Sequence, residues 1–310
     1  MLVGRLAPSP TGLLHLGNAW AFWLAWLEVR SAGGRLILRM EDIDPARSRE
    51  EFARGIRRDL AWLGLDWDGE APPQSGRGPA YAAALDALAA RGLVYPCFCS
   101  RRELRSLAGA PQVGDAGAPY PGTCRNLPPE ERQSLAEAGR RAAWRLLCPD
   151  ELPWSFRDRV HGPQSFTLAD CGGDFALCRS DGVFAYQLAV VLDDLAAGVS
   201  SVVRGDDLLP STPRQLYLYS LLGGRPPAYA HLPLLLDHRG ERLAKRHASL
   251  TLHSLRAAGL RPESVLGLLA FLAGWRAAPG PVAAADLLPG FGWSSLRPKA
   301  LILPEKPFGL

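Results

Sequence analysis

Residues 5–18 read Arg-Leu-Ala-Pro-Ser-Pro-Thr-Gly-Leu-Leu-His-Leu-Gly-Asn, and we expect the rest of the chain to be organised around this stretch. The mostly apolar residues 2–6 predict a short buried strand, which the prolines end. From Ala19 to Leu27, large apolar side chains recur at helical spacing, so a helix should begin where the stretch ends. The residues expected at the N-terminus of that helix are His15, Gly17 and Asn18.

A turn between a strand and a helix N-terminus is suited to phosphate. Backbone N–H groups of the first helical turn lack intrahelical acceptors, and the positive end of the helix dipole adds to their attraction for an anion. Gly17 removes a side chain that would hold the phosphate away. Taken alone, so short a pattern also fits an ordinary corner with a surface histidine, so both interpretations stay open at this point.

A second predicted strand, residues 35–40, would complete a βαβ unit with a parallel sheet. Ligands bind open α/β sheets outside the carboxyl ends of the strands. Glu41 follows the strand directly, so we expect it to face the same crevice as residues 5–18. Asp44, before a proline, better suits a polar turn that caps the next helix.

The composition is typical of a soluble globular protein, because 47% of the 310 residues are hydrophobic and 21% are charged. The formal net charge of +4 permits a nucleic-acid partner, but any basic face must be local. The longest aliphatic and aromatic run, residues 19–27, is too short to span a bilayer, and no leader pattern precedes the first strand. We therefore expect a cytoplasmic protein without a membrane partner.

Three of the six cysteines, Cys97, Cys99 and Cys124, cluster along the sequence. Zinc takes four ligands in a tetrahedron, mostly thiolates and imidazoles, and here Tyr120 would be an unusual fourth ligand. From chemistry alone, a zinc site and a group of buried free thiols are equally supported. The remaining cysteines, which read as structural thiols, are Cys148, Cys171 and Cys178.

The change in composition at these cysteines predicts a small inserted module. Within it, residues 130–145 predict a helix whose arginines fit either solvation or contact with RNA. Near the end of the chain, residues 252–275 predict an apolar helical segment. The predicted units are a split core of residues 1–95 and 170–240, an inserted module of residues 96–169, and a C-terminal region of residues 241–310.

Four side chains should meet at the ligand edge, because Tyr186 begins a predicted helix and Arg204 ends a predicted strand there. The guanidiniums of Arg5 and Arg204 suit carboxylates, whereas Glu41 and the phenol of Tyr186 suit an ammonium group. The ligand would be a dicarboxylic amino acid. The Lys-Arg pair 245–246 in a later loop suits a triphosphate, whose charge rises during displacement at phosphorus. A nucleotide and an amino acid in one site imply adenylation.

A series of motifs follows along the chain: Arg5-x-Ala-Pro-Ser-Pro-Thr-Gly, His15-Leu-Gly-Asn18, Arg39-x-Glu-Asp-x-Asp44, Arg179-Ser-Asp-Gly182, Tyr186-Gln-Leu-Ala189, Val190-Val-Leu-Asp-Asp194, Val203-Arg-Gly205 and Leu243-Ala-Lys-Arg246. In this order they resemble the catalytic core of the glutamyl-tRNA synthetases over residues 1–250. Within that family the chain is most similar to the short paralogues that attach glutamate to queuosine in the anticodon of tRNA(Asp).

The resemblance implies an α/β fold with a Rossmann-like class I aminoacyl-tRNA synthetase core, an inserted zinc-binding module and a small C-terminal helical region. It implies a monomer that activates L-glutamate with ATP and magnesium before any tRNA binds, and then transfers it to queuosine in the tRNA(Asp) anticodon loop. The residues that it assigns to ATP are His15, Gly17, Asn18, Lys245 and Arg246, of which His15, Asn18 and Lys245 would be catalytic. Those that it assigns to glutamate are Arg5, Ala7, Ser9, Glu41, Tyr186 and Arg204. The ligands that it assigns to one structural zinc are Cys97, Cys99, Tyr120 and Cys124.

The sequence departs from the family's two signatures. Asn18 replaces the second histidine of HIGH, and Arg242 and Ala244 replace the first lysine and the serine of KMSKS. An amide still donates to a phosphate and arginine keeps the positive charge, so we expect activity. The amino-acid carboxylate attacks the α-phosphate itself, so no protein nucleophile is required.

Three other functions compete with this interpretation. The adenylyltransferases of cofactor synthesis use a similar turn but do not require Glu41, Tyr186 or Arg204. A non-catalytic RNA-binding relic would bind ATP without pyrophosphate exchange. A truncated glutamyl-tRNA synthetase that charges the tRNA 3′ end is the nearest alternative, yet only about 60 residues follow Arg246, too few for an anticodon-binding domain.

Overall fold

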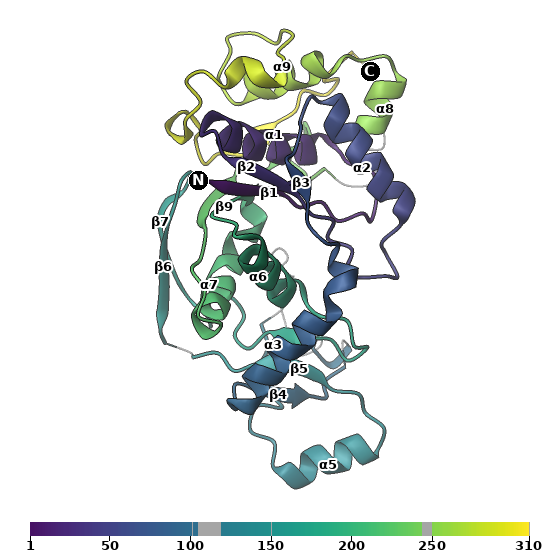
Figure 1. Cartoon of the computed structure of the whole chain (residues 1–310), viewed down its shortest axis with the longest axis vertical. Helices are drawn as coiled ribbons and strands as arrows, with labels where there is room; N and C mark the ends of the chain where they lie inside the picture. The colour runs from purple at the N-terminus through teal and green to yellow at the C-terminus, as the bar shows by residue number, and fades with distance from the viewer. Residues whose placement is uncertain (101, 105–118, 150, 244–249, 310) are drawn as a thin grey trace.

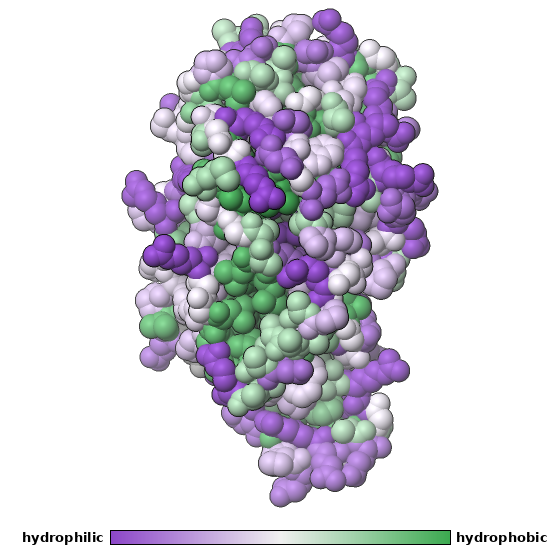
Figure 2. All heavy atoms as spheres, in the orientation of Figure 1, coloured by the Kyte–Doolittle hydropathy of each residue, from purple (hydrophilic) through white to green (hydrophobic). Residues whose placement is uncertain are grey.

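The computed structural model describes residues 1–100, 102–104, 119–149, 151–243 and 250–309. The molecule is elongated in Figure 1, with the C-terminal helices beyond α1 (Leu16–Ser31) at one end and α5 (Pro129–Glu137) at the other. Hydrophilic side chains cover most of the face in Figure 2, and apolar ones gather at the level of α6 (Tyr186–Ala197) and α7 (Thr212–Leu221). No helix within the described ranges has the length and apolar character needed to cross a membrane.

The predicted βαβ unit is confirmed. β1 (Val3–Leu6) pairs in parallel with β2 (Arg35–Leu38), which pairs with β3 (Gly69–Glu70), and α1 (Leu16–Ser31) connects the first two strands. α2 (Glu50–Trp62) and α3 (Gly78–Ala90) follow β2 and β3.

A second set of strands lies beside β1 (Figure 1). β9 (Ser201–Gly205) pairs in parallel with β10 (Ala228–Leu232), and the N–H of Ser200 donates to the carbonyl oxygen of Val3 at 2.9 Å. Next to β10 lies the hairpin of β6 (Pro153–Asp158) and β7 (Gly162–Thr167). The carboxyl ends of β1, β2 and β9 therefore face one region, as the position of ligands in open α/β sheets requires. The helices after β8 (Ala176–Cys178) and β9 are α6 (Tyr186–Ala197) and α7 (Thr212–Leu221).

α1 is buried on both sides, which explains why its sequence is apolar all round. The indole N–H of Trp20 donates to the carbonyl oxygen of Pro233, and that of Trp23 to the carbonyl oxygen of Ala284, each at 3.2 Å. The helix thus packs between the sheet and the C-terminal region in one hydrophobic core. The elements of that region include α8 (Leu252–Ala257), α9 (Pro262–Leu272) and β12 (Leu301–Ile302), which pairs in parallel with β11 (Leu235–Leu236).

One predicted helix is too long, and one predicted helical segment is divided into two helices. The helix predicted for residues 130–145 is α5 (Pro129–Glu137), because Gly139 with φ of +78° turns the chain into β5 (Ala143–Leu146). The helical segment predicted for residues 252–275 breaks into α8 and α9, because Gly259 also has φ of +78° and Pro262 begins the second helix.

The end of the molecule that holds α5 and the cysteine cluster is here called the distal module. It is built on a small antiparallel sheet of β4 (Val94–Cys97), β5 and β8 (Ala176–Cys178). In contrast, β6 pairs with β10, and β7 pairs with β6 at the edge of the same sheet. The domain boundaries stay a prediction, with the hairpin of residues 153–167 structurally attached to the core.

Candidate active site

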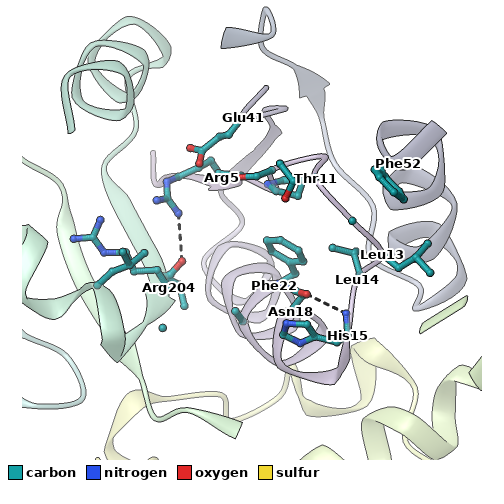
Figure 3. Close-up of a pocket in the computed structure, with 18 of the residues that line it drawn as sticks. Arg5, Thr11, Leu13, Leu14, His15, Asn18, Phe22, Glu41, Phe52 and Arg204 are labelled. Atoms are coloured by element: carbon teal, nitrogen blue, oxygen red, sulfur yellow. Dashed lines mark hydrogen bonds between the residues drawn. The ribbon is translucent and has the colours of Figure 1, made fainter. Parts of the chain in front are cut away.

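His15 is the N-cap of α1 and builds the turn. Its Nδ1 accepts from the N–H of Gly17 at 3.1 Å, while its own N–H donates to Oδ1 of Asn18 at 3.0 Å, the bond drawn in Figure 3. This reciprocal capping box explains why the helix begins here. Because the amide oxygen of Asn18 serves the cap, its amide nitrogen is the group that can donate to an anion.

The C-terminal region forms backbone hydrogen bonds with the same turn. His15 forms an isolated antiparallel bridge with Thr251, the N-cap of α8. The N–H of Leu252 donates to the carbonyl oxygen of Leu14 at 2.8 Å. The backbone of the turn is therefore held from both sides, by its own helix and by α8.

A pocket of about 900 Å³ opens at the carboxyl ends of the strands. Figure 3 shows Arg5 and Glu41 toward one side of it and His15 with Asn18 toward another, while Leu13, Phe22 and Phe52 belong to an apolar wall. A second pocket of about 280 Å³ adjoins the turn at Gly17 and is bordered by Arg242. The predicted residues that line the first pocket are Arg5, Ala7, Ser9, His15, Asn18, Glu41, Tyr186 and Arg204. Lys245 and Arg246 lie outside the described residues.

Buried charges form a network beneath the pocket. Arg39, which is 1% exposed, donates to Oδ1 of Asp194 at 2.6 Å and to Oε1 of Glu41 at 3.1 Å. Nε of Arg5 lies 3.6 Å from Oδ1 of the same Asp194, and its Nη1 donates to the carbonyl oxygen of Val203 at 3.3 Å. Two arginines therefore share one carboxylate, and Glu41 is oriented by Arg39.

Arg204 is buried among neutral partners. It donates from Nε to His231 at 3.0 Å, from Nη1 to Gln215 at 2.8 Å and from Nη2 to Thr212 at 2.8 Å. Its Nη1 also lies 3.5 Å from the hydroxyl of Tyr186. Within the described ranges these polar contacts include no carboxylate, and Figure 3 shows the guanidinium turned away from Arg5. The two predicted carboxylate binders are thus brought to one pocket but not into one cluster.

Burial shifts the two acidic groups predicted to hold an ammonium. It raises the pKa of Glu41, against the opposing charges of Arg39 and Arg5. It also raises the pKa of Tyr186, against the charge of Arg204. An ammonium ligand between them would favour the charged form of Glu41 and so offset the cost of its burial.

Sequence reasoning missed several residues of the site. Arg39 and Asp194 belong to the motifs Arg39-x-Glu-Asp-x-Asp44 and Val190-Val-Leu-Asp-Asp194, and the available signal for Arg39 was a charge without an assigned role at the end of a buried strand. The apolar wall of Leu13, Phe22 and Phe52 carried no signal, because large apolar residues near a helix are ordinary core residues.

The cysteine cluster lies in the distal module. The sulfur atoms of Cys97, Cys99 and Cys124 lie within 4.8 Å of one another, and the hydroxyl of Tyr120 is 3.3 Å from Sγ of Cys97. Ligands about 2.3 Å from a tetrahedral zinc place sulfur atoms about 3.8 Å apart, so the group fits a metal of that kind. Burial opposes the thiolate of Cys97, yet the Tyr120 hydroxyl and the charge of Arg145 lower its pKa. Burial and the neighbouring Cys97 raise the pKa of Cys99 to about 12.

Comparison with known proteins agrees with this geometry. The family model of class I tRNA synthetases (E and Q), catalytic domain, matches residues 1–280. The chain is 58% identical to the glutamyl-Q tRNA(Asp) synthetase of Nitratidesulfovibrio vulgaris, over 98% of this chain and 96% of that protein. It is 50% identical to the protein of the same name from Symbiobacterium thermophilum, over 99% and 97%.

A solved structure shows the same fold. The glutamate tRNA ligase of Elizabethkingia meningosepticum, in complex with its amino acid, superposes with a TM-score of 0.82 at 25% identity. The match covers 99% of this chain and 68% of that one. The strand order, the capped turn and the comparisons agree, and the chain belongs to the class I glutamyl- and glutaminyl-type tRNA synthetase family, in the branch of the glutamyl-Q tRNA(Asp) synthetases.

Proposed function

We propose that the protein activates L-glutamate with ATP, without tRNA, and transfers the glutamyl group to queuosine at the wobble position of tRNA(Asp). The observation that carries glutamate recognition is an imbalance of buried charge. Arg5 and Arg39 pair with the carboxylates of Glu41 and Asp194, whereas the described contacts of Arg204 include no carboxylate, and Asp158 is separated from it by His231. A buried cation without a carboxylate partner is costly, and an anionic ligand relieves that cost.

In the proposed reaction, the α-carboxylate of glutamate attacks the α-phosphorus of ATP and pyrophosphate leaves. Arg5 and Arg204 bind the side-chain carboxylate, and Glu41 with Tyr186 receives the ammonium group. The side-chain amide nitrogen of Asn18 donates to phosphate oxygens at the N-terminus of α1, where the positive end of the helix dipole attracts an anion. Ala7 and Ser9 form the pocket wall beside the amino acid.

The rest of the ATP site follows from the family resemblance. His15, Asn18, Lys245 and Arg246 stabilise the charge that develops on the phosphates, and magnesium enters with ATP. The protein contributes position and charge rather than a covalent intermediate.

The acceptor assignment is supported by the names of the relatives, both of which are glutamyl-Q tRNA(Asp) synthetases. A hydroxyl of the cyclopentenediol of queuosine would attack the carbonyl carbon of glutamyl adenylate, giving an ester and releasing AMP. Because its proposed substrate is a tRNA, we also propose that the protein is located in the cytoplasm. We propose a monomer, since all predicted site residues come from one chain.

Pyrophosphate exchange tests the first step. Purified protein with ATP, magnesium and L-glutamate should exchange labelled pyrophosphate without any tRNA, and L-glutamine should support far less exchange. Exchange that starts only when tRNA is added, or that is equal with glutamine, contradicts the assignment of the two arginines.

Labelling of tRNA tests the second step. Labelled glutamate should enter tRNA(Asp) from cells that make queuosine, but neither tRNA(Glu) nor queuosine-free tRNA(Asp). Labelling that is lost when the 3′ adenosine is oxidised selectively would instead assign the protein to 3′-end charging.

We further propose that Cys97, Cys99, Tyr120 and Cys124 hold one structural zinc, which would supply folding energy to the distal module and no chemistry at the pocket. Metal analysis should find about one zinc per chain. Cys99→Ser should lower both the zinc content and the melting temperature, whereas the control Cys178→Ala, in β8, should keep the zinc. A fully stable, zinc-free protein would show that these residues are simple core thiols.

A further inference from the structure

His231 on β10 is fully buried, does not line the pocket, and contacts Nε of Arg204, a predicted glutamate-binding residue. Its Nε2 lies 3.0 Å from Nε of Arg204, and its Nδ1 lies 2.7 Å from Oδ2 of Asp158. Asp158 is itself buried, and its other oxygen accepts from the backbone N–H groups of Val160 and His161, each at 2.9 Å. Arg204, His231 and Asp158 therefore form a continuous chain of hydrogen bonds.

The hydrogen bonds define the proton positions in this chain. Nε of Arg204 always carries hydrogen, so Nε2 of His231 must be the acceptor and Nδ1 must carry the ring proton. That N–H then donates to Asp158. Burial lowers the pKa of His231 to about 4, so the ring is neutral at physiological pH. A protonated ring would instead set one donor against another at Arg204.

A neutral acceptor has a consequence that a carboxylate would not have. Glu or Asp in contact with Arg204 would satisfy its charge and compete with an anionic ligand. His231, Thr212 and Gln215 accept its hydrogen bonds without neutralising it. Among the described residues, these three short bonds leave two of the five guanidinium N–H groups for Tyr186 and a ligand.

We propose that His231, oriented by Asp158, is a positioning residue that holds Arg204 in one geometry without a carboxylate in direct contact, and thereby sets the selectivity for glutamate over glutamine. The inference rests on the proposed function, because it assumes that Arg204 receives the side-chain carboxylate. An arginine fixed in advance loses less conformational freedom when the ligand binds. Selectivity follows because glutamine brings no charge to the fixed cation.

Two substitutions at His231 separate this role from simple packing. His231→Asn keeps an amide N–H near Nδ1 for Asp158 but removes the acceptor for Arg204. His231→Gln keeps an oxygen near Nε2 for Arg204 and gives up the bond to Asp158. In pyrophosphate exchange, His231→Asn should raise the KM for glutamate about tenfold or more and lower the glutamate-to-glutamine ratio of kcat/KM. His231→Gln should change the KM and the ratio much less, because it keeps the acceptor for Arg204. The KM for ATP should stay within about twofold in each.

Tyr229→Phe is the matched control. The ring of Tyr229 stacks on His231 at 5.8 Å between centroids, and its hydroxyl finds no hydrogen-bond partner in the described part of the chain. The substitution therefore keeps the packing around His231 and should leave glutamate selectivity unchanged. A loss of selectivity in Tyr229→Phe equal to that in His231→Asn would refute a role specific to the imidazole acceptor.

Unaltered protein provides a second readout if either variant fails to fold. Nitrogen-15 NMR at pH 7 should show His231 neutral with its proton on Nδ1, and a charged ring or the opposite tautomer overturns the proposal. Equal glutamate KM values in the Asn and Gln variants overturn it as well. If the wild-type protein itself shows no glutamate-dependent exchange, the proposed function fails; exchange by the wild type with identical Asn and Gln variants refutes the positioning role alone.

Discussion

Arg204→Gln should lower kcat/KM for glutamate by a factor of about 100 to 1000, because it removes a buried, charged donor from a carboxylate that then has fewer partners. The KM for ATP should change by less than about twofold, because the turn proposed to bind the phosphates is held by His15 and Thr251 and not by Arg204. The melting temperature should change little, because no buried carboxylate among its described contacts loses an ion-pair partner. Pyrophosphate exchange and calorimetry measure the two effects.

The control for this experiment is Arg57→Ala. Arg57 on α2 forms a partly exposed ion pair with Glu70 at 2.7 Å, and such pairs contribute about 0–1 kcal/mol. Glutamate kinetics should be unaffected by it. If Arg204→Gln unfolds the protein, or weakens ATP and glutamate use equally, Arg204 is a structural residue and not a glutamate ligand.

Arg39→Met should have the opposite pattern, with a large loss of stability. Removing Arg39 leaves Glu41 and Asp194 buried, with Arg5 as the remaining ion-pair partner of Asp194 among the described residues, and breaking a buried ion pair in this way costs about 3–5 kcal/mol. Thermal and denaturant unfolding should both show the loss, and Arg57→Met should show little of it. A stable Arg39→Met variant would mean that the two carboxylates are hydrated or protonated in the folded protein.

The pH dependence of that loss has a defined sign. In the wild type, burial raises the pKa of Glu41, so the folded state holds this proton more tightly than the unfolded chain does. The contribution of Glu41 to stability therefore falls as pH rises from its unfolded pKa toward its folded pKa. Without Arg39 the folded pKa rises further, so the deficit of Arg39→Met relative to wild type should be larger at pH 8 than at pH 5.

The sequence predicted the parts of the fold that depend on local pattern. The alternation of strand, capped helix and strand between residues 2 and 40 was recognisable, because prolines, glycines and apolar spacing determine it within a few residues. The end of the helix predicted for residues 130–145 was wrong, because β5 exists only through pairing with β4 and β8, which lie far away along the chain. The roles of the pocket residues remain predictions, although the structure brings eight of them to one pocket.

The positioning of Arg204 could not be predicted for a similar reason. His231 stands in a strand without any motif, and Asp158 precedes it by 73 residues. Only the pairing of β6 with β10 brings the two side chains together. A contact between two single polar residues far apart in the sequence produces no recognisable pattern, whereas the residues around Arg5 form one contiguous motif.

In the proposed function the phosphates of ATP bind at this turn, so the bridge between His15 and Thr251 would link ATP affinity thermodynamically to the docking of the C-terminal region. A ligand that orders the turn would also favour the backbone hydrogen bond from Leu252 to Leu14. By reciprocity, a change that weakens the packing of α8 would lower the affinity for that ligand. Substitutions at core residues that line neither pocket, such as Leu255 on α8 and Leu269 on α9, would therefore modulate nucleotide binding from a distance.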